Sequence, residues 1–167
     1  MNLITEITMP LVNFLKSNLP PNATLTDIEQ TTKALLQQVG QSVIQETLSN
    51  MKPAYPDPIT PCQCGKLAQY RWERKGHFHT LFGEVIIKRP YYLCPECRKG
   101  CYPLDKQFGL RPNQLSAELS RLVAMTGVEL PFMAGRNLFE ALTLVSVSDQ
   151  TMSKATQAIG KQVVMLE

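Results

Sequence analysis

The sequence of 167 residues predicts an α+β fold in which helical segments flank a strand-rich centre that carries the cysteines. Apolar residues recur at helical spacing near both ends of the chain, and Tyr70 and Trp72 alternate with polar residues at strand period. Two close cysteine pairs complete the pattern: Cys62 with Cys64, and Cys94 with Cys97. We therefore expect N-terminal helices, a zinc-ribbon-like β-hairpin and a C-terminal helix-turn-helix.

Four segments follow from this pattern. They are an N-terminal helical segment (1–50), a proline-rich linker (51–61), a zinc-ribbon-like module (62–110) and a helical unit of helix-turn-helix type (111–167). The linker holds four prolines, a density that favours an extended spacer and a domain boundary. These prolines are Pro53, Pro56, Pro58 and Pro61.

The N-terminal segment predicts two helices. The first runs from Thr8 to Asn18, with Pro10 in its first turn, where proline is tolerated. The second begins at a capping box over residues 26–29 and continues through Ser49. Its apolar stripe favours packing on a core, with a dedicated dimerisation helix as the alternative.

Composition excludes several classes of protein. With 44% apolar and 19% charged residues, the chain is too apolar for a disordered protein. It has no run of ~20 apolar residues for a membrane span, and Glu6 and Pro10 interrupt the pattern of an export signal. Five cysteines with two close pairs favour a metal in a reducing cytoplasm over a disulfide framework.

The net charge of +3 is unevenly distributed. Residues 61–110 carry nine Lys and Arg against four Asp and Glu, a net charge of +5, whereas residues 1–60 carry three against five, a net of −2. The cysteine-containing module is therefore the segment most suited to a polyanion, although a solvated basic face would have the same composition.

The cysteine pairs predict a structural zinc site made of Cys62, Cys64, Cys94 and Cys97. Four thiolates complete a tetrahedron and leave no position for a reactive water. Gly65 supplies the positive φ of a metal knuckle after the first pair, whereas an arginine, Arg98, stands at the equivalent position after the second. Cys101 is left over as a small apolar residue, with a substitute ligand as the alternative.

The spacing between the pairs exceeds the usual ~15–20 residues, so we expect a long hairpin. Lys75 and Gly76 favour a turn, and Pro90 an edge strand or the end of a strand. Gly83 favours a bulge, with a second turn as the alternative. His77 and His79 share one strand face. We expect them to be exposed or to face DNA, with a metal-ligand role as the alternative.

Basic and aromatic residues alternate in this module, a mixture that suits phosphate contact with some stacking. The candidate DNA-contacting residues here are Arg71, Arg74, Lys75, Lys88 and Arg89. In the alternative interpretation, Trp72 and the tyrosines form a small core while the charges confer solubility.

The C-terminal segment predicts three helices. The first starts at Ser116, the second spans Pro131–Leu142, and the third runs from Gln150 toward Val163 after a cap at Ser148 and Asp149. The last helix resembles a recognition helix, and its candidate DNA contacts are Gln150, Ser153, Lys154 and Gln157. A three-helix packing unit without DNA contact is the alternative.

No catalytic constellation is evident, because the carboxylates are scattered and neither a nucleophile with its base nor a glycine-rich phosphate loop occurs. We expect that this chain is not an enzyme on its own.

As a set, residues from Cys62 to about Gly160 resemble the N-terminal part of bacterial insertion-sequence transposases of the ISKra type. The resemblance rests on Cys62-x-Cys64-Gly65, Thr80-Leu-Phe-Gly-Glu-Val85, Arg89-Pro-Tyr-Tyr-Leu-Cys-Pro-x-Cys97, Tyr102-Pro-Leu-Asp105, Phe108-Gly-Leu110 and Val147-Ser-x-x-Thr151. It implies a zinc-ribbon-like module and a helix-turn-helix that bind DNA ahead of an Asp-Asp-Glu nuclease domain. This sequence departs from the family by ending at Glu167, before any such domain, and by having Arg98 where a glycine is usual.

We therefore expect the DNA-binding portion of a transposase, which recognises element ends in double-stranded DNA and is either a truncated remnant or a split-frame product. The alternatives are a zinc-stabilised protein-interaction module and a stand-alone transcriptional regulator. Possible protein partners are a full-length transposase or a second copy of the chain.

Overall fold

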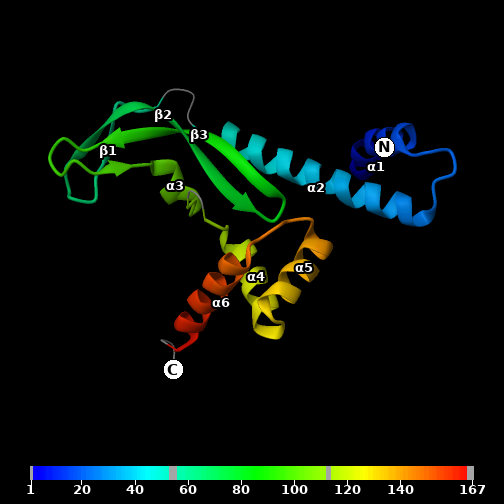
Figure 1. Ribbon diagram of the computed structural model, residues 1–167. Helices are drawn as coiled ribbons and strands as arrows, with labels where there is room; N and C mark the ends of the chain where they lie inside the picture. The colour runs from blue at the N-terminus through cyan, green and yellow to red at the C-terminus, as the bar shows by residue number, and fades with distance from the viewer. Residues whose placement is uncertain (1, 53–55, 112–113, 165–167) are drawn as a thin grey trace. The chain divides into compact units, whose positions relative to one another are not determined.

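The computed structural model describes residues 2–52, 56–111 and 114–164. It divides the chain into two compact units, residues 1–40 and 41–167. Of the expected proline-rich linker at 51–61, residues 53–55, with Pro53, fall outside the described residues. Figure 1 shows the elements in order. They are α1 (Leu3–Asn18), α2 (Leu25–Asn50), β1 (Ile59–Pro61), β2 (Leu67–Thr80), β3 (Gly83–Leu93), β4 (Gly100–Cys101), α3 (Pro103–Phe108), α4 (Ala117–Glu129), α5 (Phe132–Thr143) and α6 (Asp149–Val164).

The predicted α+β class is confirmed. The strands form one antiparallel sheet in the order β1-β2-β3-β4, in which neighbours along the chain are also neighbours in the sheet. Most of its pairing lies in the long hairpin of β2 and β3. Hairpin arms of this length explain the wide spacing of the two cysteine pairs.

Both N-terminal helices begin earlier than expected. The side chain of Asn2 caps α1 by accepting a hydrogen bond from the amide of Ile4, so the helix starts at Leu3 and Pro10 lies inside it rather than in its first turn. The capping box of α2 pairs Thr24 with Asp27, each side chain accepting the other's amide hydrogen bond, and not the predicted residues 26–29. No residue of α2 is buried, so its expected packing on a core is limited to partial contacts.

The hairpin turn lies at Leu81 and Phe82, not at Lys75–Gly76, which belong to β2. Gly83 is therefore not a bulge but the first residue of β3, directly after the turn, and its φ of +103° suits a residue without a Cβ. The register shift occurs instead between Tyr70 and Trp72.

Pro90 lies in a stretch of β3 that has, among the described strands, a neighbour on one side only, as the edge-strand alternative predicts. It lies within β3 opposite Glu73, and β4 pairs with β3 only at Tyr92 and Leu93. Among the described residues, two glutamines of α2 bond the rest of that edge: Gln41 donates to the carbonyl of Glu84, and Gln45 accepts from the amide of Ile86. Side-chain bonds of this kind satisfy strand groups that would otherwise be open to another chain.

The proline-rich segment is not only a spacer. Ile59–Pro61 forms β1 and pairs with Leu67–Gln69. The hydroxyl of Tyr92 donates to the carbonyl of Asp57 at 3.0 Å, and the amide of Tyr70 donates to the carbonyl of Pro58 at 2.9 Å. These bonds attach the segment to the cysteine end of the sheet.

Two apolar clusters lie away from the cysteines. One contains Phe78, Val85 and Ile87 of the hairpin with Leu104 of α3, and side chains of α2 cover part of it. The other fills the interior between α4, α5 and α6, which pack together in Figure 1. Its buried members are Leu119, Val123, Ala124, Phe139, Val145, Val147, Met152 and Ala155.

The three C-terminal helices begin close to their predicted starts. Ser116 caps α4, and Ser148 accepts a hydrogen bond from the amide of Thr151 in the first turn of α6. The short helix α3 has no counterpart in the expected elements. Two backbone hydrogen bonds of His79 join the hairpin to the start of α4. The amide of His79 donates to the carbonyl of Gln114, and its carbonyl accepts from the amide of Ser116. None of the described helices has the length and apolar composition needed to cross a membrane.

Candidate metal centre and basic hairpin

Each cysteine pair lies on a tight turn with the same pattern of backbone bonds. The amide of Cys62 donates to the carbonyl of Lys66 at 2.8 Å, and the amide of Cys94 donates to the carbonyl of Lys99 at 3.0 Å. The residue after each pair has a positive φ, +81° at Gly65 and +54° at Arg98. Arg98 therefore adopts the knuckle conformation that Gly65 adopts without a steric cost.

The four sulfurs converge as predicted, within 4.8 Å of one another. The Cys62 and Cys97 sulfurs are 3.6 Å apart, and those of Cys64 and Cys94 are 3.7 Å apart. A tetrahedron of ~2.3 Å metal–thiolate bonds has edges of about 3.8 Å, so these separations fit such an ion. The four side chains could hold a metal.

The local environment shifts the pKa values of Cys94 and Cys97 in opposite directions. Backbone amides, first that of Cys97, lower the pKa of Cys94 to about 7, against the effect of burial. The amide of Lys99 acts in the same direction on Cys97, but burial and the neighbouring thiols outweigh it and raise the pKa of Cys97 to about 12. One thiol of the set is thus partly ionised near neutral pH, as a metal ligand must be on binding.

Three other candidate ligands lie outside this set of sulfurs. Cys101 packs beside the cluster, in agreement with its expected role as a small apolar residue. His77 and His79 are half-buried at the other end of the hairpin, where Nδ1 of His77 lies 3.1 Å from a carboxylate oxygen of Glu84.

The sequence predicts Arg89 as a DNA contact, but the structure places its side chain in the interior. Its side chain is 3% exposed and its Nε donates to the carboxylate of Asp105 in α3. Burial raises the pKa of Asp105, and the guanidinium of Arg89 opposes that shift. The guanidinium also lies 4.1 Å from the ring centroid of Tyr102.

Gly76 makes room for this arginine. A Cβ at Gly76 would lie 2.2 Å from Nη1 of Arg89, so no larger residue fits while the guanidinium remains there. Gly76 thus interrupts the strand pattern because of close packing, not because the chain turns there.

The other predicted basic residues of the hairpin are exposed: Arg71, Arg74, Lys75 and Lys88. Lys75 and Lys88 are cross-strand partners, an arrangement that two like charges disfavour unless an anion lies nearby. Arg74 lies on the opposite face of the sheet from Lys75, above the ring of Tyr91.

Among the described charged residues of the module that form no ion pair, the excess of cations over carboxylates is larger than in its composition. Two of the module's four carboxylates form ion pairs with Lys or Arg: Glu73 with Lys52, and Asp105 with Arg89. Glu84 contacts Nδ1 of His77, a pair of opposite charges only when the histidine is protonated. Within the described residues, Glu96 has no ion pair, and neither do eight of the nine Lys and Arg. These eight are Lys66, Arg71, Arg74, Lys75, Lys88, Arg98, Lys99 and Lys106.

The predicted contacts of α6 lie on one face of the helix, at positions i, i+3, i+4 and i+7, opposite the buried Met152. Ser153 and Gln157 are joined by a hydrogen bond of 3.3 Å and, with Gln150, follow one helical row. Lys154, at the edge of this face, also lines a groove with Thr151. The four residues therefore share one side of the helix, on which Gln150, Lys154 and Gln157 are exposed and Ser153 is half-buried.

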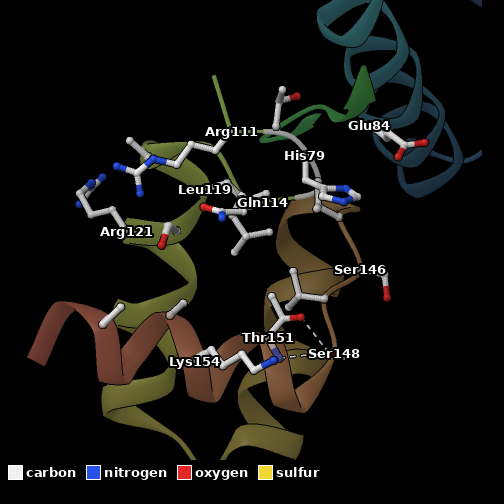
Figure 2. Close-up of a pocket in the computed structure, with 18 of the residues that line it drawn as sticks. His79, Glu84, Arg111, Gln114, Leu119, Arg121, Ser146, Ser148, Thr151 and Lys154 are labelled. Carbon is white, nitrogen blue, oxygen red and sulfur yellow. Dashed lines mark hydrogen bonds between the residues drawn. The ribbon is translucent and has the colours of Figure 1, made fainter. Parts of the chain in front are cut away.

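This groove, of about 1300 Å³, lies between the hairpin tip, the start of α4, and α6 with the turn before it. Figure 2 shows Ser148, Thr151 and Lys154 on one wall, with Arg111 and Arg121 across from them. Arg121 is bound by Glu118, and the one carboxylate among the lining residues, Glu84, pairs with His77. Arg111 and Lys154 are the cations of the groove without an ion pair among the described residues.

Sequence reasoning missed Asp105, Gly76 and Arg111. Asp105 and Gly76 have roles that depend on Arg89, which is distant from both along the chain. Arg111 stands alone in the sequence, and only the folded chain brings it to the groove.

Comparisons of the chain with protein-family models, curated proteins and solved structures found no match.

Proposed function

We propose that this chain binds double-stranded DNA through the basic surface of its four-cysteine module, and that zinc is the metal its cysteines hold. One observation carries the proposal: among the described residues, the module has eight exposed cations without ion pairs, against two carboxylates without a Lys or Arg partner, Glu84 and Glu96. An excess of this kind attracts the phosphates of a duplex and releases their counterions.

Zinc is proposed because four thiolates at tetrahedral separations suit its ligand preference. The ion would be structural, since four protein ligands leave no position for water. It would fix the two knuckles, and with them Lys66, Arg98 and Lys99, at one end of the hairpin.

The resemblance to ISKra-type transposases gives this binding a role: recognition of element ends in a cytoplasmic DNA transposition reaction. Cutting and joining would be the task of an Asp-Asp-Glu nuclease domain and not of residues 62–167. The groove beside α6 supports a contribution of the C-terminal helices, in which Arg111 and Lys154 contact the DNA backbone.

The test is duplex binding by the zinc-loaded protein as a function of salt. The double variant Lys75→Ala/Lys88→Ala removes the facing pair, and we expect the slope of log K against log salt to decrease in magnitude by about 1.8, which is 0.9 per phosphate contact. The variant Lys16→Ala/Lys33→Ala removes the same charge from residues 1–40 and should leave the slope unchanged. Wild-type protein that shifts no duplex at low salt would refute the proposal.

Exposed apolar residues favour a second candidate, a protein-interaction module. Val128 of α4 is 71% exposed, and Met133 and Leu142 of α5 are each 65% exposed. A full-length transposase or a second copy of this chain would be the partner. Co-purification with such a partner, together with no binding to duplex DNA, would favour this function over the first.

A further inference from the structure

Three aromatic rings form a contiguous surface on one face of the sheet, which we call the aromatic platform: Trp72, Tyr91 and Tyr102. The ring centroids of Trp72 and Tyr91 are 5.6 Å apart, and those of Tyr91 and Tyr102 are 5.2 Å apart. Trp72 remains 49% exposed at the end of the row, whereas the two tyrosines are half-buried. A large indole that is half open to solvent offers a surface for a ligand.

The platform is held from both sides. At Gly100, which directly follows the second knuckle, a Cβ would lie 2.4 Å from the ring of Tyr91, so that ring packs directly on the backbone. At the other end the buried guanidinium of Arg89 lies 4.1 Å from the centroid of Tyr102. Rings fixed in this way lose little freedom when a ligand stacks on them.

Positive charge surrounds the exposed ring. The Arg74 guanidinium carbon lies 4.4 Å from the centroid of Tyr91 and 5.4 Å from that of Trp72. Arg71, at the register shift beside Trp72, is exposed. Neither arginine has an ion pair among the described residues, and the carboxylate between them in sequence, Glu73, is bound by Lys52.

We propose that Trp72 is a stacking site for an unpaired base of a single-stranded nucleic acid, with Arg71 and Arg74 contacting the flanking phosphates. Every base has a flat π-face, whereas the phosphates on either side are anionic, so the ligand matches both the ring and its charged surroundings. A duplex keeps its base faces inside its own stack. This site therefore takes a ligand different from the duplex proposed above, and it does not depend on that function.

Trp72 is the one tryptophan of the chain, so its fluorescence reports directly on this site. An oligodeoxythymidylate of about 12 nucleotides, within the usual size of a single-strand site, is added to the zinc-loaded protein at low salt. We expect quenching of the Trp72 emission that saturates with the oligonucleotide. A duplex of the same length should bind without this quenching.

The contribution of the ring is measured with a labelled oligonucleotide and fluorescence anisotropy. Trp72→Ala should weaken binding by about 5- to 150-fold, the range for one stacked base, and Trp72→Phe should retain most of the affinity. Phe82→Ala is the matched control, because Phe82 is a partly exposed aromatic residue at the hairpin turn outside the platform, and we expect it to bind as wild type does.

Three results would overturn the proposal: no binding of the oligonucleotide at low salt, equal affinity in Trp72→Ala, or equal quenching by the duplex. If Trp72→Ala fails to retain zinc, the emission of the wild-type protein and the affinity of Trp72→Phe still decide the question. Because duplex binding is measured separately, with Lys75→Ala/Lys88→Ala, failure of one proposal leaves the other standing.

Discussion

The C-terminal helices and the cysteine end of the sheet have interiors of opposite character. Between α4, α5 and α6, eight buried apolar residues pack together, with Met152 and Leu119 fully buried. At the cysteine end, the buried set is Ala68, Tyr92 and Cys94, surrounded by the remaining cysteines and Tyr70. Apolar burial can hold the helices together, whereas the small core of the cysteine end needs a metal or another cross-link.

The middle of the hairpin uses a third arrangement, in which the buried Arg89–Asp105 pair connects β3 to α3. Such a pair contributes little net stability compared with apolar residues of the same volume, but breaking it leaves an unpaired buried charge. The three regions should therefore respond to different perturbations, and the following experiments separate them.

Metal removal should have the largest effect. Chelation or Cys94→Ser should release the metal and disorder the cysteine end while the C-terminal helices persist, because structural zinc sites contribute about 10–16 kcal/mol of apparent binding free energy. Metal stoichiometry and amide hydrogen exchange measure the two outcomes. Cys101→Ser is the control and should retain the metal. Unchanged amide protection around Cys62 and Cys94 after chelation would contradict the claim that the cysteine end, unlike the C-terminal helices, depends on a metal.

Breaking the buried ion pair should have the next largest effect. We expect Arg89→Ala to lower the free energy of unfolding by about 3–5 kcal/mol, since the carboxylate of Asp105 loses its partner in a mostly buried site. Denaturant unfolding measures this loss. Lys88→Ala, at the exposed neighbouring position, should change stability by no more than about 0.5 kcal/mol. Equal losses in the two variants would show that burial of Arg89 has no energetic consequence.

A cavity in the interior of the C-terminal helices should lower the stability of these helices and leave the cysteine end unchanged. Met152 is fully buried, and Met152→Ala should reduce the stability of the C-terminal helices by about 2–5 kcal/mol while the metal content stays at the wild-type value. Gln150→Ala, exposed on the same helix, serves as the control. Loss of metal in Met152→Ala would mean that the two regions fold as one unit.

The smallest expected effect is that of pH on metal affinity. The pKa of Cys94 is lowered to about 7, so above this pH the side chain is a thiolate, and below it a proton must leave before the metal binds. Affinity should therefore decrease as the pH falls through 7, by about tenfold per pH unit for each proton released. The other thiols release protons throughout this range, so the contribution of Cys94 is a steepening of the profile by about one further decade per pH unit below pH 7. Competition titrations with a chelator between pH 6 and 8 measure the slope, and the same slope above and below pH 7 would contradict this assignment.

Local signals allowed much of the fold to be predicted. The four metal-ligand candidates and the starts of α4 and α6 depend on residues within a few positions of one another, as at Ser116 and Ser148. The predicted capping box of α2 differs from the observed one by two residues because Thr24 and Thr26 are each followed three positions later by a carboxylate, Asp27 and Glu29. Only the structure shows that Thr24 accepts the hydrogen bond, from the amide of Asp27.

The errors in the hairpin have one non-local cause. Gly76 has the sequence signature of a turn, and Arg89 that of a surface cation, but each residue is explained by the other. Basic residues that are alike in sequence therefore divide in the structure: Lys88 is exposed, while its neighbour Arg89 is buried against Asp105. Strand alternation places Arg89 on the face of Val85 and Ile87 and Lys88 on the other. Because Ile86 makes the second face apolar as well, the alternation alone does not show which face is buried.

The contact between Gly76 and Arg89 also constrains how this protein can evolve. Because a Cβ at position 76 would overlap the guanidinium, a homologue with any other residue there must have moved or lost the arginine at position 89. The carboxylate at Asp105 would then have no partner and should be replaced in the same lineage. Positions 76, 89 and 105 should therefore vary together, as one inherited unit across three separate elements of the chain.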